Sequence, residues 1–425
     1  MYGRYCPVAI LLLLVISVSF SLSGQTPTDE PWSAWLYTPG DPPGLTQPQP
    51  QLVRVYADGT TEEFTPAIPP GSTMRNPTFS DNGNWVAYCV EDPVNLTHEL
   101  HALDLSNGAD GLAQARGITF PIVYPLEQTA SCQEIAFSED ETKLALTIFN
   151  TVADATMPSW EILIFNLITG AVEKRLSPDS FALAYPDNPQ SSYQGLEFCL
   201  YLDDSTVIFR LLPLLPVETS YPQSVTSAYS WNTKTDVIAP YPLWDSVSVN
   251  IAAVPAAAGQ ARYEYVWIGA DDHFPTAEVR ITPDNVVMYS DGSSGSAYPI
   301  YTHPEGLGSA EFVDGGRHIV AFAPAYSAGV VIDRNGAQTI LSENTNIWRP
   351  FFGTDEGFVM VELDGFSGAT RLIHYRFTPD GQRVEPTTLW EVLWGEHTPD
   401  RYWSLVWCTP MQLAADLQPF PPIQP

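Results

Sequence analysis

The chain has 425 residues and a formal net charge of −31, from 18 Lys and Arg against 49 Asp and Glu. A surface this negative repels phosphate backbones, which excludes nucleic acid as a partner. Charged residues make up only 16% and hydrophobic residues 44%, which excludes an acidic disordered polymer, and 39 prolines argue against long helices.

The first residues predict a signal for export. Arg4 precedes an apolar run from Val8 to Val18, which is shorter than the ~20 residues of a membrane span. Small residues before Gly24 predict cleavage after Ser23 or Gly24. We therefore expect a signal peptide at 1–23, a linker at 24–31, no membrane span after cleavage, and a secreted or otherwise extracytoplasmic protein, in the periplasm or at the cell surface. An uncleaved signal anchor is the alternative.

Beyond residue 30, a short apolar strand, a tight polar turn and a second apolar strand recur along the chain. The copies lie at Asn76–Cys89, Glu134–Leu146, Glu197–Phe209, Ala310–Phe322 and Arg349–Val361. A third strand with its own turn follows each hairpin, and a weaker fourth strand comes next. Four antiparallel strands repeated in this way predict an all-β fold, a β-propeller with four-stranded blades.

The two ends of the chain predict how this propeller closes. The N-terminal part has strands at Trp35–Tyr37, Leu52–Tyr56 and Thr61–Thr65 but no leading strand, and Trp403–Cys408 is a leading strand without followers. Together, 32–66 and 402–408 make one complete blade, which removes exposed sheet edges. With one further blade between Val247 and Met288, the prediction is seven blades over 32–410, with six or eight as alternatives, and a Pro-rich tail at 411–425.

The turn sequences resemble those of one known family. Phe79-Ser-Asp-Asn-Gly83 is followed by Asp104-Leu-Ser-Asn-Gly108, and Phe137-Ser-Glu-Asp140 by Phe165-Asn-Leu-Ile-Thr-Gly170. They resemble the WD40-like repeats of TolB-type propellers, which have a Phe-Ser-Pro-Asp-Gly-like turn, although the central Pro is missing here. The resemblance implies a bacterial-type secreted propeller.

Candidate binding residues lie in or beside the long loops between second and third strands, which emerge on one face of a propeller. A rigid scaffold with long loops on one face predicts a ligand- or partner-binding surface there. A carboxylate pair beside an imidazole suits a cation or acid–base chemistry, and aromatic side chains stack on sugars or anchor a partner. A solvated turn and core packing are the alternatives for these residues. The candidates are Asp271, Asp272, His273, Phe274, Trp160, Tyr221, Tyr326 and Phe366.

Four cysteines remain after the signal: Cys89, Cys132, Cys199 and Cys408. Four cysteines allow three pairings. Because Cys89 ends a second strand and Cys132 begins the first strand of the next blade, both at the loop face, we favour a disulfide between them, with two reduced buried thiols as the alternative. Asn95 opens an Asn-Leu-Thr glycosylation sequon.

No catalytic residue, metal or cofactor is assigned. G-x-S-x-G, P-loop and dinucleotide motifs are absent, and His98 and His101 lack the spacing of H-E-x-x-H. We expect a non-catalytic, monomeric scaffold that binds a protein or carbohydrate at the loop face. The alternatives are a propeller-type extracellular hydrolase or lyase with acidic and His residues at the channel mouth, and a lectin-like glycan binder.

Overall fold

The computed structural model describes most of the chain after residue 31, and the expected signal peptide and linker lie outside the described residues. The described residues are 32–38, 50–66, 68–69, 71–92, 95, 97–105, 122–126, 130–150, 159–184, 193–201, 204–213, 228–240, 266–267, 278–281, 286–290, 298–302, 309–322, 327–336, 338–345, 347–364, 368–378, 384–393, 403–409, 411, 414 and 417–423.

These residues form seven four-stranded antiparallel sheets and one short helix, so the all-β prediction is confirmed. Three sheets come from the first half of the chain: β4 (Thr73–Phe79), β5 (Trp85–Asp92), β6 (Thr97–Asp104) and β7 (Ile122–Leu126); β8 (Ala130–Phe137), β9 (Lys143–Asn150), β10 (Ser159–Asn166) and β11 (Val172–Leu176); β12 (Tyr193–Tyr201), β13 (Thr206–Pro213), β14 (Ala228–Asn232) and β15 (Val237–Pro240).

Three more sheets come from the second half. Their strands are β16 (Val266–Trp267), β17 (Glu278–Ile281), β18 (Val286–Ser290) and β19 (Tyr298–Thr302); β20 (Ser309–Val313), β21 (His318–Phe322), β22 (Ser327–Asp333) and β23 (Gln338–Thr345); β24 (Ile347–Thr354), β25 (Gly357–Asp364), β26 (Ala369–Phe377) and β27 (Val384–Leu393). The seventh sheet joins the chain ends: β28 (Ser404–Cys408), β1 (Ser33–Thr38), β2 (Gln51–Tyr56) and β3 (Thr61–Phe64).

A serine closes the turn between first and second strands. Ser80 follows β4, and its hydroxyl accepts a hydrogen bond from the Trp85 N–H at 3.0 Å while its own N–H donates to the Trp85 carbonyl at 3.1 Å. Ser138 makes the same pair of bonds with Lys143, at 2.9 and 3.0 Å. The serine of the recurring Phe-Ser motif is therefore fixed by hairpin chemistry, because its hydroxyl satisfies the first N–H of the second strand.

A different side chain forms the turn after the third strand. The Asn166 Oδ1 atom accepts hydrogen bonds from the N–H groups of Ile168 and Thr169 at 3.0 and 2.9 Å. Asn232 does the same for Lys234 and Thr235. Asn and Asp favour turns because their side chains bond to the backbone two residues further on. This chemistry explains why an Asn or Asp ends the third strands β10, β14 and β22.

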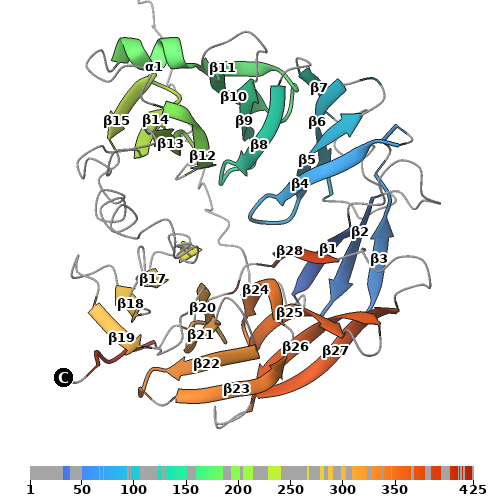
Figure 1. Ribbon diagram of the computed structural model, residues 1–425, viewed down its shortest axis with the longest axis vertical. Coiled ribbons are helices and arrows are strands. Elements are labelled where there is room, and N and C mark those ends of the chain that lie inside the picture. Colours follow the sequence, from blue (N-terminus) through green and yellow to red (C-terminus); the bar gives the residue numbers. More distant parts are fainter. Residues whose placement is uncertain are drawn as a thin grey trace, which may run out of the picture. The chain divides into compact units, whose positions relative to one another are not determined.

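The joined sheet reproduces the serine-closed turn across the two chain ends. In Figure 1 the red β28 lies beside the blue β1, and the two strands pair antiparallel. Thr409 follows β28 as Ser80 follows β4, and its hydroxyl accepts from the Ser33 N–H at 2.9 Å while its N–H donates to the Ser33 carbonyl at 2.8 Å. Thr409 and Ser33 thus make the bonds of an ordinary first–second turn without a chain between them.

A second repeated bond supports this equivalence. The carbonyl just before the second strand accepts from the N–H at the end of the third strand, as in Asn84 with Leu105 at 2.6 Å and Thr142 with Leu167 at 2.9 Å. In the joined sheet the Trp32 carbonyl accepts from the Ala57 N–H at 3.0 Å. Trp32 therefore occupies the place of the last turn residue.

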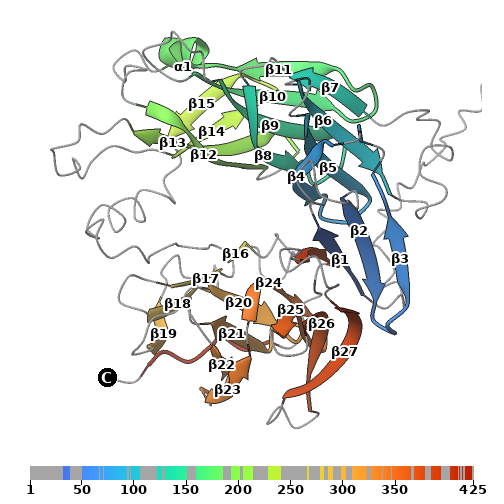
Figure 2. The same cartoon turned by 45° about the vertical axis from the view of Figure 1, so that its right-hand side comes forward.

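Neighbouring sheets contact each other mainly through their first strands, and the β16–β19 sheet does so through its second strand, β17. The contacting pairs are β28 with β4, β4 with β8, β8 with β12, β17 with β20, β20 with β24, and β24 with β28. Figure 2 shows β20 next to β24, with the strands of each sheet following outward from them. Apolar side chains from facing sheets fill the space between, for example Phe322, Phe351 and Phe358 between the β20–β23 and β24–β27 sheets.

The helix α1 (Pro178–Ala184) follows β11 and was not predicted. Ser177 precedes it and Pro178 is its first residue, the position that tolerates proline best. The Ser177 N–H donates to the Ser180 hydroxyl at 2.8 Å and the Ser180 N–H to the Ser177 hydroxyl at 3.4 Å, a reciprocal cap. Seven residues are too short for apolar periodicity, so only this cap marks the helix in the sequence.

His374 on β26 predicts a loss of stability in acid. The side chain is fully buried, and burial, followed by the charge of Arg376, lowers its pKa from 6.5 to about 4. Arg376 Nε donates to Nδ1 at 3.2 Å, so Nε2 carries the proton that faces the Thr354 hydroxyl at 3.1 Å. Between pH 6.5 and pH 4, His374 takes up a proton in the unfolded chain but not in the folded chain. The free energy of unfolding therefore falls as the pH drops through this window. The contribution of this one group is about 3 kcal/mol.

Denaturant unfolding at several pH values checks this prediction. Carboxylates titrate in the same pH window. The pH dependence of the free energy of unfolding is therefore compared between the chain and its His374→Gln variant, whose side chain stays uncharged. The variant should have the shallower slope between pH 6.5 and pH 4. Parallel slopes would contradict the assignment.

Candidate functional site

Most of the candidate loop residues lie outside the described residues. These are Asp271, Asp272, His273, Phe274, Tyr221, Tyr326 and Phe366. Of the eight candidates, only Trp160 can therefore be placed.

Trp160 lies in the core. It is 3% exposed and shares one face of β10 with Ile162 and Ile164, in a cluster between the β8–β11 and β12–β15 sheets. Its ring lies 6.1 Å from Phe181 of α1 and 6.2 Å from Phe209 of β13. A tryptophan enclosed in this way cannot stack on a ligand. Trp160 therefore has the alternative role given for the aromatic candidates, which is core packing. The alternation of Trp160, Ile162 and Ile164 is the sequence pattern that indicates this.

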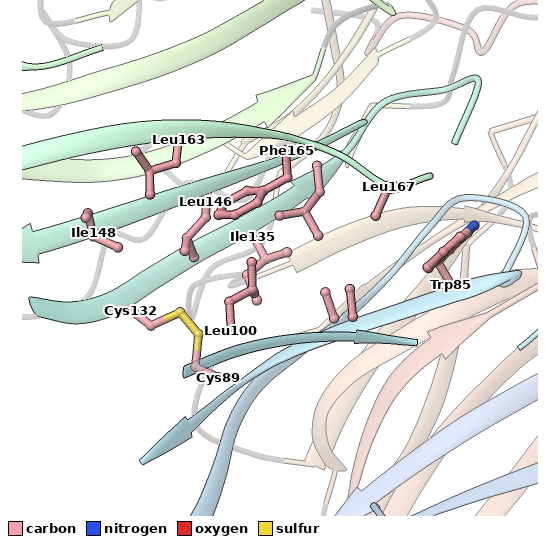
Figure 3. Close-up of a cluster of buried hydrophobic side chains, with 13 residues drawn as sticks. Trp85, Cys89, Leu100, Cys132, Ile135, Leu146, Ile148, Leu163, Phe165 and Leu167 are labelled. Carbon is pink, nitrogen blue, oxygen red and sulfur yellow. A yellow bond between two sulfur atoms is a disulfide. The ribbon is translucent and has the colours of Figure 1, made fainter. Parts of the chain in front are cut away.

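The structure joins Cys89 and Cys132 in a disulfide, the pair that the sequence favours. The two Cα atoms are 6.3 Å apart, inside the usual range. Figure 3 shows the bridge at one end of a buried cluster with Leu100 and Ile148 nearby. It links the end of β5 to the start of β8, and so fixes two neighbouring sheets to each other where the second–third loops leave them.

Charged groups lie next to this bridge. Arg75 Nε donates to Glu91 Oε2 at 2.8 Å, and His98 Nδ1 lies 3.9 Å from Glu91 Oε1. Strand pairing brings them together, because Glu91 is directly opposite His98 and Arg75 is opposite Cys89. The Arg75 side chain is 61% exposed. We call Arg75, Cys89, Glu91, His98 and Cys132 the disulfide edge. Sequence analysis considered His98 but missed Arg75 and Glu91, which only the strand register reveals.

His101 serves a different surface of the same sheet. His98 pairs with Glu91 and His101 with Tyr88, and residues three apart on a strand point to opposite faces. His101 is buried, and its Nε2 lies 2.8 Å from Glu99 Oε2 and its ring 5.5 Å from Tyr88. Burial raises the pKa of Tyr88. The two histidines cannot share a ligand, which agrees with the rejection of a zinc-protease motif.

Asn95, the glycosylation candidate, is exposed in the loop after β5. Its N–H donates to Asp92 Oδ1 at 3.0 Å and its side-chain amide to Asp92 Oδ2 at 2.7 Å. Asp92 therefore folds the start of this loop and holds the Asn95 side chain at its surface.

Carboxylates at the opposite end of the sheets tie neighbouring turns together. Asn84 donates to Glu141 Oε2 at 2.8 Å, and the Asp140 N–H donates to Asp204 Oδ1 at 2.8 Å. Burial, with the charge of Glu141, raises the pKa of Asp81. These groups have structural partners, so we place the candidate site at the disulfide edge.

Glu134 combines a raised pKa with a position at an irregularity in strand pairing, which makes it a candidate for acid–base chemistry. It sits on the first strand β8 at an irregularity in the pairing with β9, between Cys132 and Ile135. Its N–H donates to the Thr147 hydroxyl at 2.8 Å, and although its side chain reaches solvent, burial raises its pKa. Bulges of this kind often lie beside active sites.

The described residues contain neither a metal-binding cluster nor a membrane-spanning helix. No three His, Cys, Asp or Glu side chains there are grouped to hold a metal ion. No described helix is both long and apolar enough to cross a membrane.

Solved structures with a similar fold are peptidases. No protein-family model and no curated protein matches the chain. An acylaminoacyl peptidase in complex with a chloromethyl ketone is 11% identical, with a TM-score of 0.50 over 85% of this chain and 51% of that chain. Prolyl oligopeptidase B from Galerina marginata is 12% identical, with a TM-score of 0.51 over 83% of this chain and 49% of that chain. The β-propeller domain of the Trilobed protease from Pyrococcus furiosus is 12% identical, with a TM-score of 0.48 over 86% of this chain and 93% of that chain.

The likenesses to the acylaminoacyl peptidase and to prolyl oligopeptidase B show the fold. Both are propeller-containing peptidases, and the chain spans about half of their length. The chain has a β-propeller fold. The finer resemblance to TolB-type repeats has no match among family models.

Proposed function

We propose that this chain is an exported, closed seven-bladed β-propeller of TolB-like type that binds a protein partner at its loop face without catalysing a reaction. The disulfide edge carries the proposal: a charged, partly exposed surface on the β4–β7 sheet, which a disulfide joins to the neighbouring β8–β11 sheet.

Closure is supported by the hydrogen bonds at the chain ends. Thr409 and Ser33 repeat the bonds of Ser80 with Trp85, and β28 contacts the first strands of both neighbouring sheets, β4 and β24. Ring closure requires that the sheet made by the two chain ends contact a neighbouring sheet on each of its sides. Seven four-stranded sheets among the described residues support a count of seven blades.

Export is supported by the disulfide. Disulfides form and persist in oxidising compartments and are rare in the cytosol. The apolar run from Val8 to Val18 supplies the matching signal. N-terminal sequencing of the mature protein should begin at Gly24 or Gln25.

A protein partner fits the disulfide edge better than a glycan does. Its described side chains are an arginine, a carboxylate and a histidine, whereas sugars are bound by exposed aromatic rings. Arginine is enriched at protein interfaces, and a rigid surface loses little conformational entropy on binding.

Saturable binding by the purified chain tests this proposal. Proteins crosslinked in the native extracytoplasmic fraction are identified, and the affinity of each is measured with Arg75→Ala and with Arg317→Ala. Arg317 is a matched control, since it is also about half exposed and paired with a carboxylate, Asp314. Arg75→Ala should weaken binding about tenfold and Arg317→Ala should not, because only Arg75 lies at the disulfide edge. Equal affinities would reject the edge as the binding surface.

The hydrolase alternative rests on Glu134 and on the peptidase likeness. A carboxylate with a raised pKa at a first-strand bulge suits a general acid. Turnover of peptide or glycoside substrates that Glu134→Gln abolishes, with stability unchanged, would favour this function over the scaffold.

A further inference from the structure

The C-terminal segment Leu417–Ile423 is bound to the sheets like a peptide ligand. Phe420 is 1% exposed and belongs to the apolar cluster shared by the β16–β19 and β20–β23 sheets. Its ring lies 5.2 Å from that of Tyr289 and 6.3 Å from that of Phe312. The Pro-rich C-terminal segment thus contributes one of the most buried side chains of the described residues.

Arg334, in the turn after β22, holds the segment from the other side. Its guanidinium lies 4.3 Å from the centre of the Phe420 ring, and its Nη1 donates to the Gln418 carbonyl. The same guanidinium donates to the Gly316 carbonyl at 2.9 and 2.7 Å through Nε and Nη2. One arginine therefore fixes both the ring and the backbone of the segment to the β20–β23 sheet.

Backbone bonds tie the segment to β19. The Tyr298 hydroxyl donates to the Phe420 carbonyl at 2.8 Å, and the Ile423 N–H donates to the Pro299 carbonyl at 2.9 Å. Just before the segment, the Ala414 N–H donates to the Gly315 carbonyl at 2.9 Å, and within it Gln418 accepts from Arg334 of the β20–β23 sheet. The segment therefore contacts both sheets that share the cluster.

The composition of the segment suits reversible docking. Three of its seven residues are Pro419, Pro421 and Pro422, whose φ angles are fixed before binding, so that little entropy is lost when the segment orders. An aromatic anchor in an aromatic-lined groove, flanked by prolines, is a recurring way to recognise Pro-rich peptides.

We propose that the groove between the β16–β19 and β20–β23 sheets is a peptide-binding site for a Pro-flanked aromatic residue, occupied by the chain's own Leu417–Ile423 as a detachable clasp. Every described buried hydrophobic residue of the β16–β19 sheet, namely Val287, Tyr289 and Ile300, lies in the cluster that Phe420 completes. Release of the clasp therefore loosens this sheet before the others.

Hydrogen exchange on the full chain tests the clasp. Phe420→Ala should raise exchange in 286–290 and 298–302 by about 100-fold and leave 143–150 and 159–176 unchanged, since truncating a buried phenylalanine costs its packing locally. Phe181→Ala is the matched control, a phenylalanine equally buried in the cluster between the β8–β11 and β12–β15 sheets, and should give the reverse pattern. A rise of equal size in both regions would overturn the proposal.

A milder variant covers the case in which Phe420→Ala does not fold. Tyr298→Phe keeps the ring and removes only the hydroxyl that donates to the Phe420 carbonyl. It should raise exchange in 298–302 and 417–423 about fivefold, the effect of one hydrogen bond, with no change in 159–176. Unchanged exchange in 417–423 would overturn the clasp.

Peptide binding tests the groove itself. A labelled peptide with the sequence of residues 417–425 should bind Phe420→Ala, whose groove has lost its own anchor, at least about tenfold more tightly than the unaltered chain. The same peptide with alanine in place of its phenylalanine should not bind. Equal affinity for the two proteins would overturn the proposal that the site accepts a peptide.

Discussion

Replacing Cys89 and Cys132 together by alanine is expected to lower the free energy of unfolding by about 4 kcal/mol. The disulfide closes a loop of 43 residues, and the chain-entropy model gives roughly this value for a loop of that size. Alanine avoids placing a hydroxyl in the apolar cluster around Leu100 and Ile148. Equilibrium denaturation of the double variant and of the unaltered chain measures the difference.

A reductant supplies the control for this experiment. It should shift the unaltered chain toward the stability of the double variant and leave the double variant where it is. Cys408 is buried and forms no disulfide, so it should not respond first. A loss below about 1 kcal/mol in the double variant would mean that the bridge adds little to the packing of the two sheets.

Trp407→Ala and Gly83→Ala are each expected to destabilise the fold strongly, and less than additively in combination. Trp407, on β28, is 8% exposed, and its truncation should cost about 3–5 kcal/mol. Gly83, in the turn after β4, has a φ of +68°, and a Cβ there would lie 2.6 Å from the Trp407 ring. With alanine at 407 the methyl group has room, so the double variant should recover at least about 1 kcal/mol of the summed losses.

Gly71→Ala separates backbone strain from steric overlap in this cycle. Gly71 has a φ of +83° but nothing within 4 Å of an added Cβ. The free energy of unfolding lost in Gly71→Ala, about 1 kcal/mol, therefore measures only the cost of placing a side chain on left-handed backbone. Gly83→Ala should cost more than Gly71→Ala, by the overlap with Trp407. Equal costs, or strict additivity in the cycle, would show that β28 does not press on the β4–β5 turn.

Local chemistry made much of the fold predictable. The Phe-Ser turn recurs because the hydroxyls of Ser80 and Ser138 close hairpins, and Asn166 and Asn232 recur because their side chains form turns. Each of these bonds spans only a few residues, so the sequence shows them directly. The pairing of Cys89 with Cys132 followed from the same regularity, because strand order places the two ends side by side.

Features that depend on contacts between distant segments were not predictable. Trp160 stands beside a long loop in the sequence, yet α1 and β13 enclose it. Glu91 and His98 meet only through strand register, and Phe420 is buried only because two sheets form a groove for it. A Pro-rich tail and an exposed loop have the composition that surface segments have, and composition does not record a partner far away in the chain.

The bonds between Thr409 and Ser33 impose an order on events during synthesis. These residues are 376 positions apart, so at 5–20 residues per second β1 is made roughly 20 to 75 seconds before β28 exists. Throughout that time β1 has a free edge with Ala34, Trp35 and Leu36 at its centre, and an apolar free edge is the kind that recruits other chains. Synthesis of β28 is therefore the event that ends the risk of aggregation at this edge, and every shortened product that stops before Ser404 keeps the edge open.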